Sequence, residues 1–135
     1  MTDANQVTRF VNPPTMPQPV GYSQIAEISG GRTIYISGQI AADPTGQVVG
    51  PGDLHAQTVQ IFENIAAALA AVGASFQHVV KLNFYLLDIT QIAVVRGVRD
   101  RYIDIQRPPT STAVEIRRLV RDDLLIEIDA IVVLP

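Results

Sequence analysis

The sequence predicts an α+β fold in which two helices cover one face of a five- or six-stranded sheet. Several segments alternate apolar and polar residues, which is the period of a β-strand. In two other segments the apolar residues recur at steps of three and four, which is the period of an α-helix. The chain has 135 residues, so we expect one domain over residues 1–135. Apolar residues make up 47% and charged residues 17%, a composition that can build its own core.

Short strands and turns are expected in the N-terminal part of the chain. Residues 7–11 form a first strand, and the proline-rich residues 12–19 run extended and irregular. Residues 25–28 and 33–37 form two more strands. We expect residues 30–31 to join these two strands as a hairpin, because both are glycine and tolerate positive φ.

The clearest helix begins at residue 54, and Gly73 ends it. Asp53 stands directly before it, where a carboxylate can cap the amides of the first turn. One stripe of side chains is predicted to pack inward: Leu54, Thr58, Ile61, Phe62, Ile65, Leu69 and Val72. Four polar side chains fall outside this stripe: Gln57, Gln60, Glu63 and Asn64. The helix is therefore amphipathic and packs on one face.

The second half of the chain predicts a strand, a helix and a final hairpin. Residues 78–87 alternate in the manner of a strand, and a second helix follows at about residues 91–105. Two prolines at 108–109 end that helix. Residues 112–119 and 124–134 are expected to pair as the last two strands of the sheet.

The face of the sheet away from the helices has no element left to cover it. Apolar side chains are nevertheless predicted on this face: Leu125, Ile131, Val133, Val79 and Tyr85. A large bare apolar patch is unusual on a monomer, so we expect this face to be covered by another subunit.

Composition excludes several functions. The chain has no cysteine, so disulfides, thiol catalysis and cysteine-ligated metals are excluded. His55 and His78 do not have the spacing of metal ligands, so no metal site is expected. The formal net charge of −3 argues against a nucleic-acid binder. No signal peptide and no membrane-length apolar stretch are found, so no membrane association and a cytoplasmic location are expected.

Several short segments, spread from about residue 7 to residue 133, resemble segments of a known protein family and occur in the same order. They are residues 21–24, 35–40, 43–46, 57–64, 79–81, 109–119 and 126–130. Together they resemble the YjgF/YER057c/UK114 family, also called the RidA (reactive intermediate deaminase) family. The resemblance implies a chorismate-mutase-like fold of the bacillus type, with a six-stranded mixed sheet backed by two helices. It also implies a homotrimer with ligand clefts between subunits, and hydrolysis of 2-enamine or 2-imine acids to 2-keto acids and ammonia without cofactor or metal.

The resemblance places the substrate-binding positions, and one of them departs from the family pattern. Active members hold the substrate carboxylate with an arginine four residues before a glutamate that here is Glu115, so Ser111 takes the arginine's place. A neighbouring cleft position on the second helix, often asparagine, corresponds to Arg96. Ala113 is assigned to the same cleft. The alternative for Arg96 is an ordinary solvated charge on a helix.

Other cleft positions match the family. Glu127 can orient a water or move its proton, and partial burial would raise its pKa toward that task. Tyr22 can offer its hydroxyl over a cleft, and the backbone at Ser37 and Gly38 can present an amide to an anionic oxygen. The structural alternatives are an ion pair of Glu127 with Lys81 or an arginine, an ordinary packed ring for Tyr22, and an end-of-strand glycine.

Three functions follow from these observations. The first is hydrolytic deamination of a small imine or enamine, or a related water addition, with Glu127 and Tyr22 as catalytic residues. The second is a trimer that binds a small metabolite without turning it over, which the absence of the arginine favours. The third is a ribonuclease, against which the acidic balance of charge weighs.

Overall fold

The computed structural model describes residues 6–135. Eight strands and helices follow one another along the chain: β1 (Thr8–Val11), β2 (Ile25–Ile28), β3 (Arg32–Gln39), α1 (Leu54–Ala71), β4 (Val79–Leu86), α2 (Ile92–Arg99), β5 (Thr110–Glu115) and β6 (Ile126–Leu134). Short 3-10 turns, Phe76–His78 and Ile89–Gln91, lead into β4 and α2.

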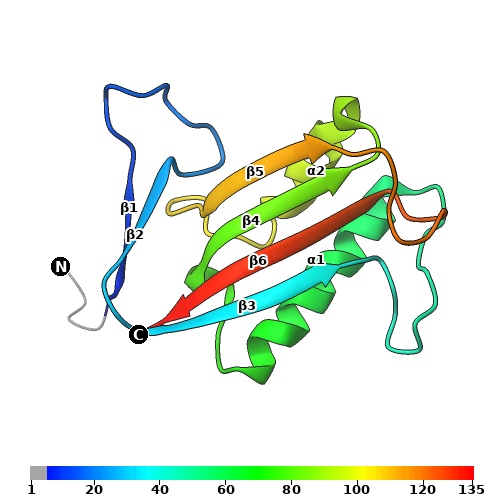
Figure 1. Cartoon of the computed structure of the whole chain (residues 1–135), viewed down its shortest axis with the longest axis horizontal. Helices are drawn as coiled ribbons and strands as arrows, with labels where there is room; N and C mark the ends of the chain where they lie inside the picture. The colour runs from blue at the N-terminus through cyan, green and yellow to red at the C-terminus, as the bar shows by residue number, and fades with distance from the viewer. Residues whose placement is uncertain (1–5) are drawn as a thin grey trace.

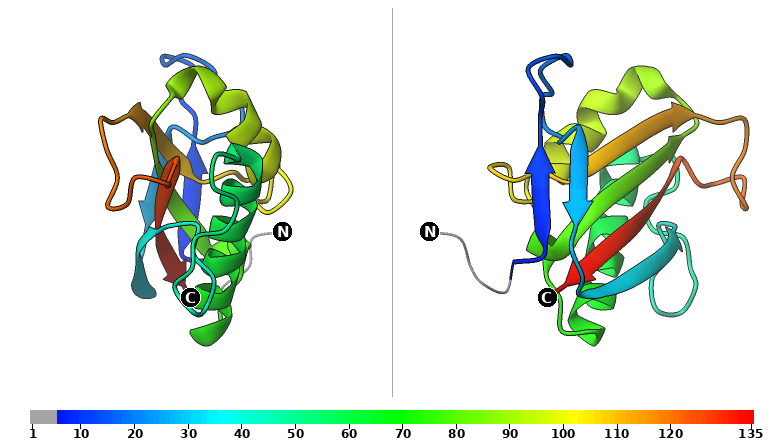
Figure 2. Two further views of the ribbon diagram at one scale, coloured as in Figure 1. Left: turned by 90° about the vertical axis from the view of Figure 1, so that its right-hand side faces the viewer. Right: turned by 60° about the vertical axis from the view of Figure 1, so that its left-hand side comes forward.

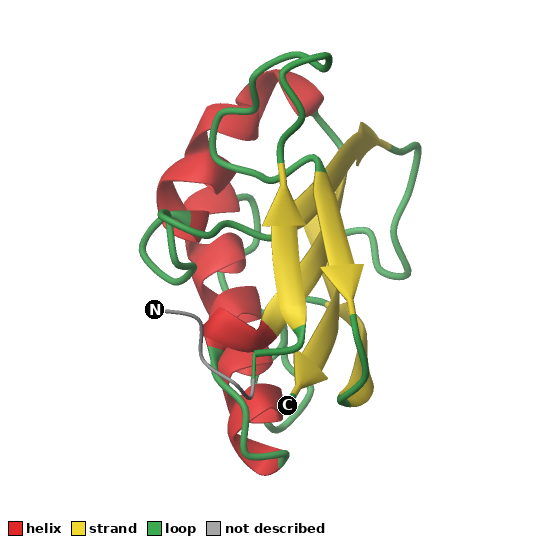
Figure 3. Ribbon diagram, turned by 90° about the vertical axis from the view of Figure 1, so that its left-hand side faces the viewer, coloured by secondary structure: helices red, strands yellow, loops and turns green. Residues whose placement is uncertain are grey.

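The main sheet has four strands in the order β3-β6-β4-β5 (Figure 1). Strand β6 pairs antiparallel with β3 and β4, whereas β5 runs parallel to β4. Both helices lie on one face of this sheet, as the side views in Figures 2 and 3 show. The predicted α+β fold, with two helices on one face of a mixed sheet, is therefore confirmed. The face without helices is called the open face below.

The prediction of one six-stranded sheet is wrong in its pairing. Strand β2 pairs with β1 to form a separate two-stranded sheet, and β3 pairs with β6, so residues 30–31 do not join a β2–β3 hairpin. Both Gly30 and Gly31 do have positive φ, as predicted, at 90° and 79°. They redirect the chain between the two sheets instead of reversing it.

The segment before β2 is attached to β5, which explains this arrangement. Ser23 forms a parallel bridge with Thr110, and its backbone amide donates to the Pro109 carbonyl at 3.0 Å. Its hydroxyl also donates to the Pro108 carbonyl at 2.5 Å. These long-range bonds hold the β1–β2 sheet at the end of the main sheet where β5 begins (Figure 1).

The predicted final hairpin is also wrong, because β4 lies between β5 and β6. A parallel pair needs a long crossover connection, and α2 with its flanking turns supplies it between β4 and β5. The segment after β5 then passes the end of β4, where the Ile116 amide donates to the Leu86 carbonyl at 2.8 Å. Both elements are shorter than predicted: α2 ends at Arg99 and β5 at Glu115.

Helix α1 forms where the sequence predicts it, with two differences from the predicted stripe. Val72, predicted to pack inward, is the exposed residue that follows the helix, and one residue predicted to lie outside the stripe is buried. Asp53 caps the helix by accepting a hydrogen bond from the Ala56 amide at 3.0 Å. Gln57, predicted outside the inward stripe, is fully buried. Its amide donates to the carbonyls of Gly50 at 3.1 Å and Asp123 at 2.8 Å, and accepts from the Leu125 amide at 2.8 Å. Because every polar atom is paired, this buried side chain ties the helix to two loops.

The open face is less apolar than the alternation predicted. Val79 and Val133 are 1% and 3% exposed within the single chain. A register shift between Val79 and Lys81 turns Val79 into the core, and the segment at Gly31 lies against Val133. Leu125 also packs partly against the core. Tyr85 and Ile131 are half-buried, and they share this face with polar side chains of β4 and β6.

Replacing Gly31 by alanine should destabilise the fold far more than the same change at Gly30. Both positions have positive φ, which costs an L-residue about 1–2 kcal/mol. A Cβ at Gly31 would also overlap the Leu134 carbonyl oxygen, adding about 1–3 kcal/mol, whereas a Cβ at Gly30 meets no atom of residues 6–135 within 4 Å. Urea unfolding of the two variants measures the difference. Equal losses would show that the β2–β3 connection does not press on β6 in the way described.

Candidate functional site

A cavity of about 210 Å³ opens beside α2, β4, β5 and the loop before β2. We call it the helix-side cavity. Its lining combines apolar and polar side chains: Val20, Tyr22, Phe84, Ile92, Val95, Arg96, Arg99, Ser111 and Ala113. A cavity of this size suits one small molecule.

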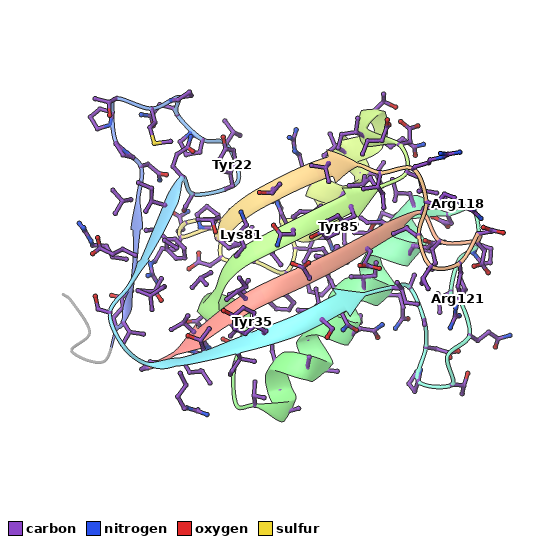
Figure 4. All side chains as sticks on the ribbon, viewed as in Figure 1. Tyr22, Tyr35, Lys81, Tyr85, Arg118 and Arg121 are labelled. Atoms are coloured by element: carbon purple, nitrogen blue, oxygen red, sulfur yellow. The ribbon has the colours of Figure 1, made fainter. Side chains whose placement is uncertain are left out.

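The helix-side cavity brings together four of the predicted site residues: Tyr22, Arg96, Ser111 and Ala113. Ser111 and Ala113 lie in register with Leu82 and Phe84 of β4, whose side chains are buried beneath the helices. Because side chains alternate across a strand, Ser111 and Ala113 both face the helix side. Figure 4 shows Tyr22 beside the start of β5.

Glu127 and Gly38 lie together on the open face. Glu127 is in register with Tyr85 of β4, and its neighbours Ile126 and Ile128 are fully buried on the helix side. A Cβ at Gly38 would overlap the Glu127 carboxylate, so the glycine lets β3 approach this side chain closely. Ser37, directly before Gly38, is exposed. We call Ser37, Gly38 and Glu127 the open-face site.

The predicted site residues therefore form two groups on opposite faces of the sheet. Tyr22, Arg96, Ser111 and Ala113 line the helix-side cavity, and the remaining three form the open-face site. A layer of buried strand residues separates them within one chain.

Asp129 organises the polar side chains of the open face. It accepts hydrogen bonds from the Asn83 amide at 2.7 Å and from the Tyr85 hydroxyl at 3.0 Å. The bond to Asp129 is the main cause that raises the pKa of Tyr85, with burial second. Lys81, labelled with Tyr85 in Figure 4, donates to the Thr112 hydroxyl at 2.9 Å and forms no ion pair with Glu127.

Glu127 holds its proton more tightly than an ordinary glutamate. Burial raises the pKa of Glu127, and the negative charge of Asp129 raises it further. A carboxyl with a raised pKa is suited to giving and taking a proton near neutral pH. The predicted direction of the shift, and partial burial as its cause, are confirmed.

Arg99 is a cavity residue that the sequence analysis missed. Its side chain is 9% exposed, whereas Arg96, one turn earlier on α2, is exposed. Nε and Nη2 of Arg99 both lie 2.9 Å from Oδ1 of Asp100. The helical period predicts this position, because Arg99 follows Ile92 and Val95 at steps of three and four residues and so lies on the same face of α2.

Outside these two groups, a wider groove of about 490 Å³ lies between the β1–β2 sheet and residues 106–108. The Arg107 guanidinium lies over the Phe10 ring beside this groove, 5.3 Å from the ring centre, and none of the predicted site residues lines the groove.

Within residues 6–135, no group of three or more acidic or histidine side chains is placed to hold a metal ion. In the same range, none of the helices combines the length and apolar character needed to cross a bilayer.

The fold is that of an α+β domain with two helices on one face of a mixed sheet, and comparison with known proteins gives its family. The family model described as Endoribonuclease L-PSP matches residues 15–134. The chain belongs to this family, which is the YjgF or Rid family that the sequence resembles. The family prediction is confirmed.

Relatives and solved structures agree with this assignment. A RutC family protein of Pyrococcus horikoshii is 44% identical over 117 residues, covering 85% of this chain and 89% of that protein. A 2-iminobutanoate/2-iminopropanoate deaminase of Dermatophagoides farinae is 31% identical, covering 93% of this chain and 96% of its own. The crystal structure of the Rid family protein YyfB of Yersinia pestis, described as of unknown function, has a TM-score of 0.87 at 32% identity. It covers 96% of this chain and all of that one.

Asp129→Asn should lower the pKa of Glu127, because it removes one of the two causes that raise it. The folded pKa of Glu127 lies above its unfolded value, so its stabilising contribution is present below the unfolded pKa and is lost as pH rises through the folded pKa. The substitution should reduce that loss. Carbon-13 NMR titration of the Glu127 carboxyl measures the shift directly.

Asp122→Asn is the matched control, since Asp122 is 89% exposed in the loop before β6. It should leave the Glu127 titration as in the wild type. A Glu127 pKa that stays unchanged or rises in Asp129→Asn would contradict the electrostatic account of the open face.

Proposed function

We propose that this protein hydrolyses a small imine or enamine in a cleft formed between two copies of the chain. One copy would supply the helix-side cavity, and the next copy would supply the open-face site. The products would be a carbonyl compound and ammonia, with no cofactor or metal. We propose the cytoplasm as its location.

The placement of the two groups on opposite faces of the sheet carries this proposal. A small ligand in the helix-side cavity has buried strand residues between it and Glu127 of the same chain. It can meet Glu127 of a second copy if the β5 edge of one subunit packs against the open face of the next. Such a contact joins two different surfaces, and repeated contacts of this kind form a ring when the rotation between copies closes and a filament when it does not. A homotrimer is the ring we propose.

The chemistry would use Glu127 as a proton carrier. Its carboxylate takes a proton from a water as the water oxygen bonds to the imine carbon. The same proton then passes to the nitrogen, which gives a carbinolamine. Glu127 next moves the proton of the new hydroxyl to the nitrogen, and the carbon–nitrogen bond breaks as the carbon–oxygen double bond forms, releasing ammonia. The raised pKa of Glu127 supports these transfers. The amide at Gly38 and the Tyr22 hydroxyl would stabilise the polar intermediate.

The relative named as a 2-iminobutanoate deaminase supports this reaction class. The alternative is a trimer that binds a small metabolite without turnover, and Ser111 at the usual arginine position favours it. Ribonuclease activity, the third hypothesis, has no support in the site beyond the description of the family model.

The direct test generates 2-imino acids in solution with an amino-acid oxidase and follows keto-acid formation. We expect wild-type protein to accelerate hydrolysis, and Glu127→Gln to reduce the acceleration by about 10²–10⁴-fold, since it removes the proton carrier. Glu63→Gln, at an exposed position of α1, is the matched control and should retain the full rate.

Two outcomes would contradict the proposed reaction. Wild-type protein without any acceleration would leave the binding module as the better description. Acceleration that survives in Glu127→Gln would remove the open-face site from the chemistry.

A further inference from the structure

Arg99 is the one buried charged residue within residues 6–135. A buried charge is costly unless it is paired. Its carboxylate partner, Asp100, takes both Nε and Nη2 on a single oxygen, and the Asp100 side chain is itself 48% exposed. The ion pair therefore neutralises the guanidinium incompletely, because water screens an exposed carboxylate.

The remaining nitrogen of this guanidinium, Nη1, donates to no residue of the described part of the chain. Its donor capacity is free on a side chain that lines the helix-side cavity. The loop before β2 covers the same group. Gly21 has a φ of 80°, and a Cβ there would overlap Nη2 of Arg99. The loop that places Tyr22 at the cavity thus also packs on Arg99.

The rest of the lining defines the chemistry of the ligand. Among residues 6–135, no acidic side chain lines this cavity, while Arg96 adds a second positive charge. Phe84, Ile92 and Val95 form an apolar wall, and about 210 Å³ leaves room for a compact molecule. A positive charge in a concave site concentrates small anions.

We infer that Arg99 anchors the carboxylate of a small organic acid with a compact apolar side chain. The inference deepens the proposed function and rests on it for the place of the site. Nη1 donates to the carboxylate, the hydroxyls of Tyr22 and Ser111 add neutral hydrogen bonds, and the tail packs on the apolar wall. An arginine at position 111 would share the cavity with Arg99 and repel it. The serine there is therefore compatible with acid binding.

A matched pair of probes tests this anchor without requiring turnover. 2-Oxobutanoate and 2-oxobutanamide differ in charge at one end, and isothermal titration calorimetry compares their affinities. Wild-type protein should bind the acid about 10- to 100-fold more tightly than the amide. Arg99→Met should abolish this preference. Arg101→Met, at an exposed position two residues on, should keep it.

A second variant keeps the test decisive if Arg99→Met fails to fold. Asp100→Asn leaves Arg99 in place and removes its carboxylate partner, so affinity for 2-oxobutanoate should rise. The anchor is overturned if wild type binds neither probe or both equally, if the preference survives in Arg99→Met, or if Asp100→Asn leaves acid affinity unchanged or lower.

These outcomes are distinct from failure of the proposed reaction. Binding of the acid through Arg99 without imine hydrolysis would support the anchor and overturn the deaminase. Hydrolysis with an unchanged KM in Arg99→Met would support the deaminase and overturn the anchor.

Discussion

The two-residue alternation of β6 across the pleat of the sheet is the constraint on which the site depends. Ile126, Ile128 and the later core residues point toward the helices, so Glu127 and Asp129 must point the other way. The side chains of strand β5 alternate in the same way, and there the predicted site residue Ser111 is one that points toward the helices. The two groups of predicted site residues are thus held apart within one chain, and in the proposed cleft they meet only through a second copy.

Local pattern predicted the elements well and their partners poorly. The α1 stripe, the Asp53 cap and the alternation of β6 follow from sequence periods of a few residues. Pairing depends on contacts far apart in the chain, such as Ser23 with Thr110, which no local period records. The bulge that buries Val79 likewise depends on its register against β6. The helical period predicts that Arg99 is buried, but a charged residue is ordinarily expected on the solvent-exposed face of a helix.

The two halves of the proposed cleft also carry opposite charge. Arg96 and Arg99 give the helix-side cavity positive charge, whereas on the open face the carboxylates of Glu127 and Asp129 outnumber the ammonium of Lys81. Contact between unlike faces of two copies is favoured by this complementarity, and contact between like faces is disfavoured. The same charges can therefore favour the contact between unlike faces. Inside the proposed cleft they would also place the Arg99 guanidinium opposite the Glu127 carboxylate.

The central claim, a site built from two copies, is tested most directly by cross-linking, because the chain has no cysteine of its own. A Ser37→Cys/Ser111→Cys double variant places one thiol at the open-face site and one in the helix-side cavity. The double variant is treated with a short bifunctional thiol-reactive cross-linker and run on a denaturing gel. It should show covalent dimers and trimers, while each single variant stays monomeric. Monomer alone, or a bridge within one chain, would contradict the account.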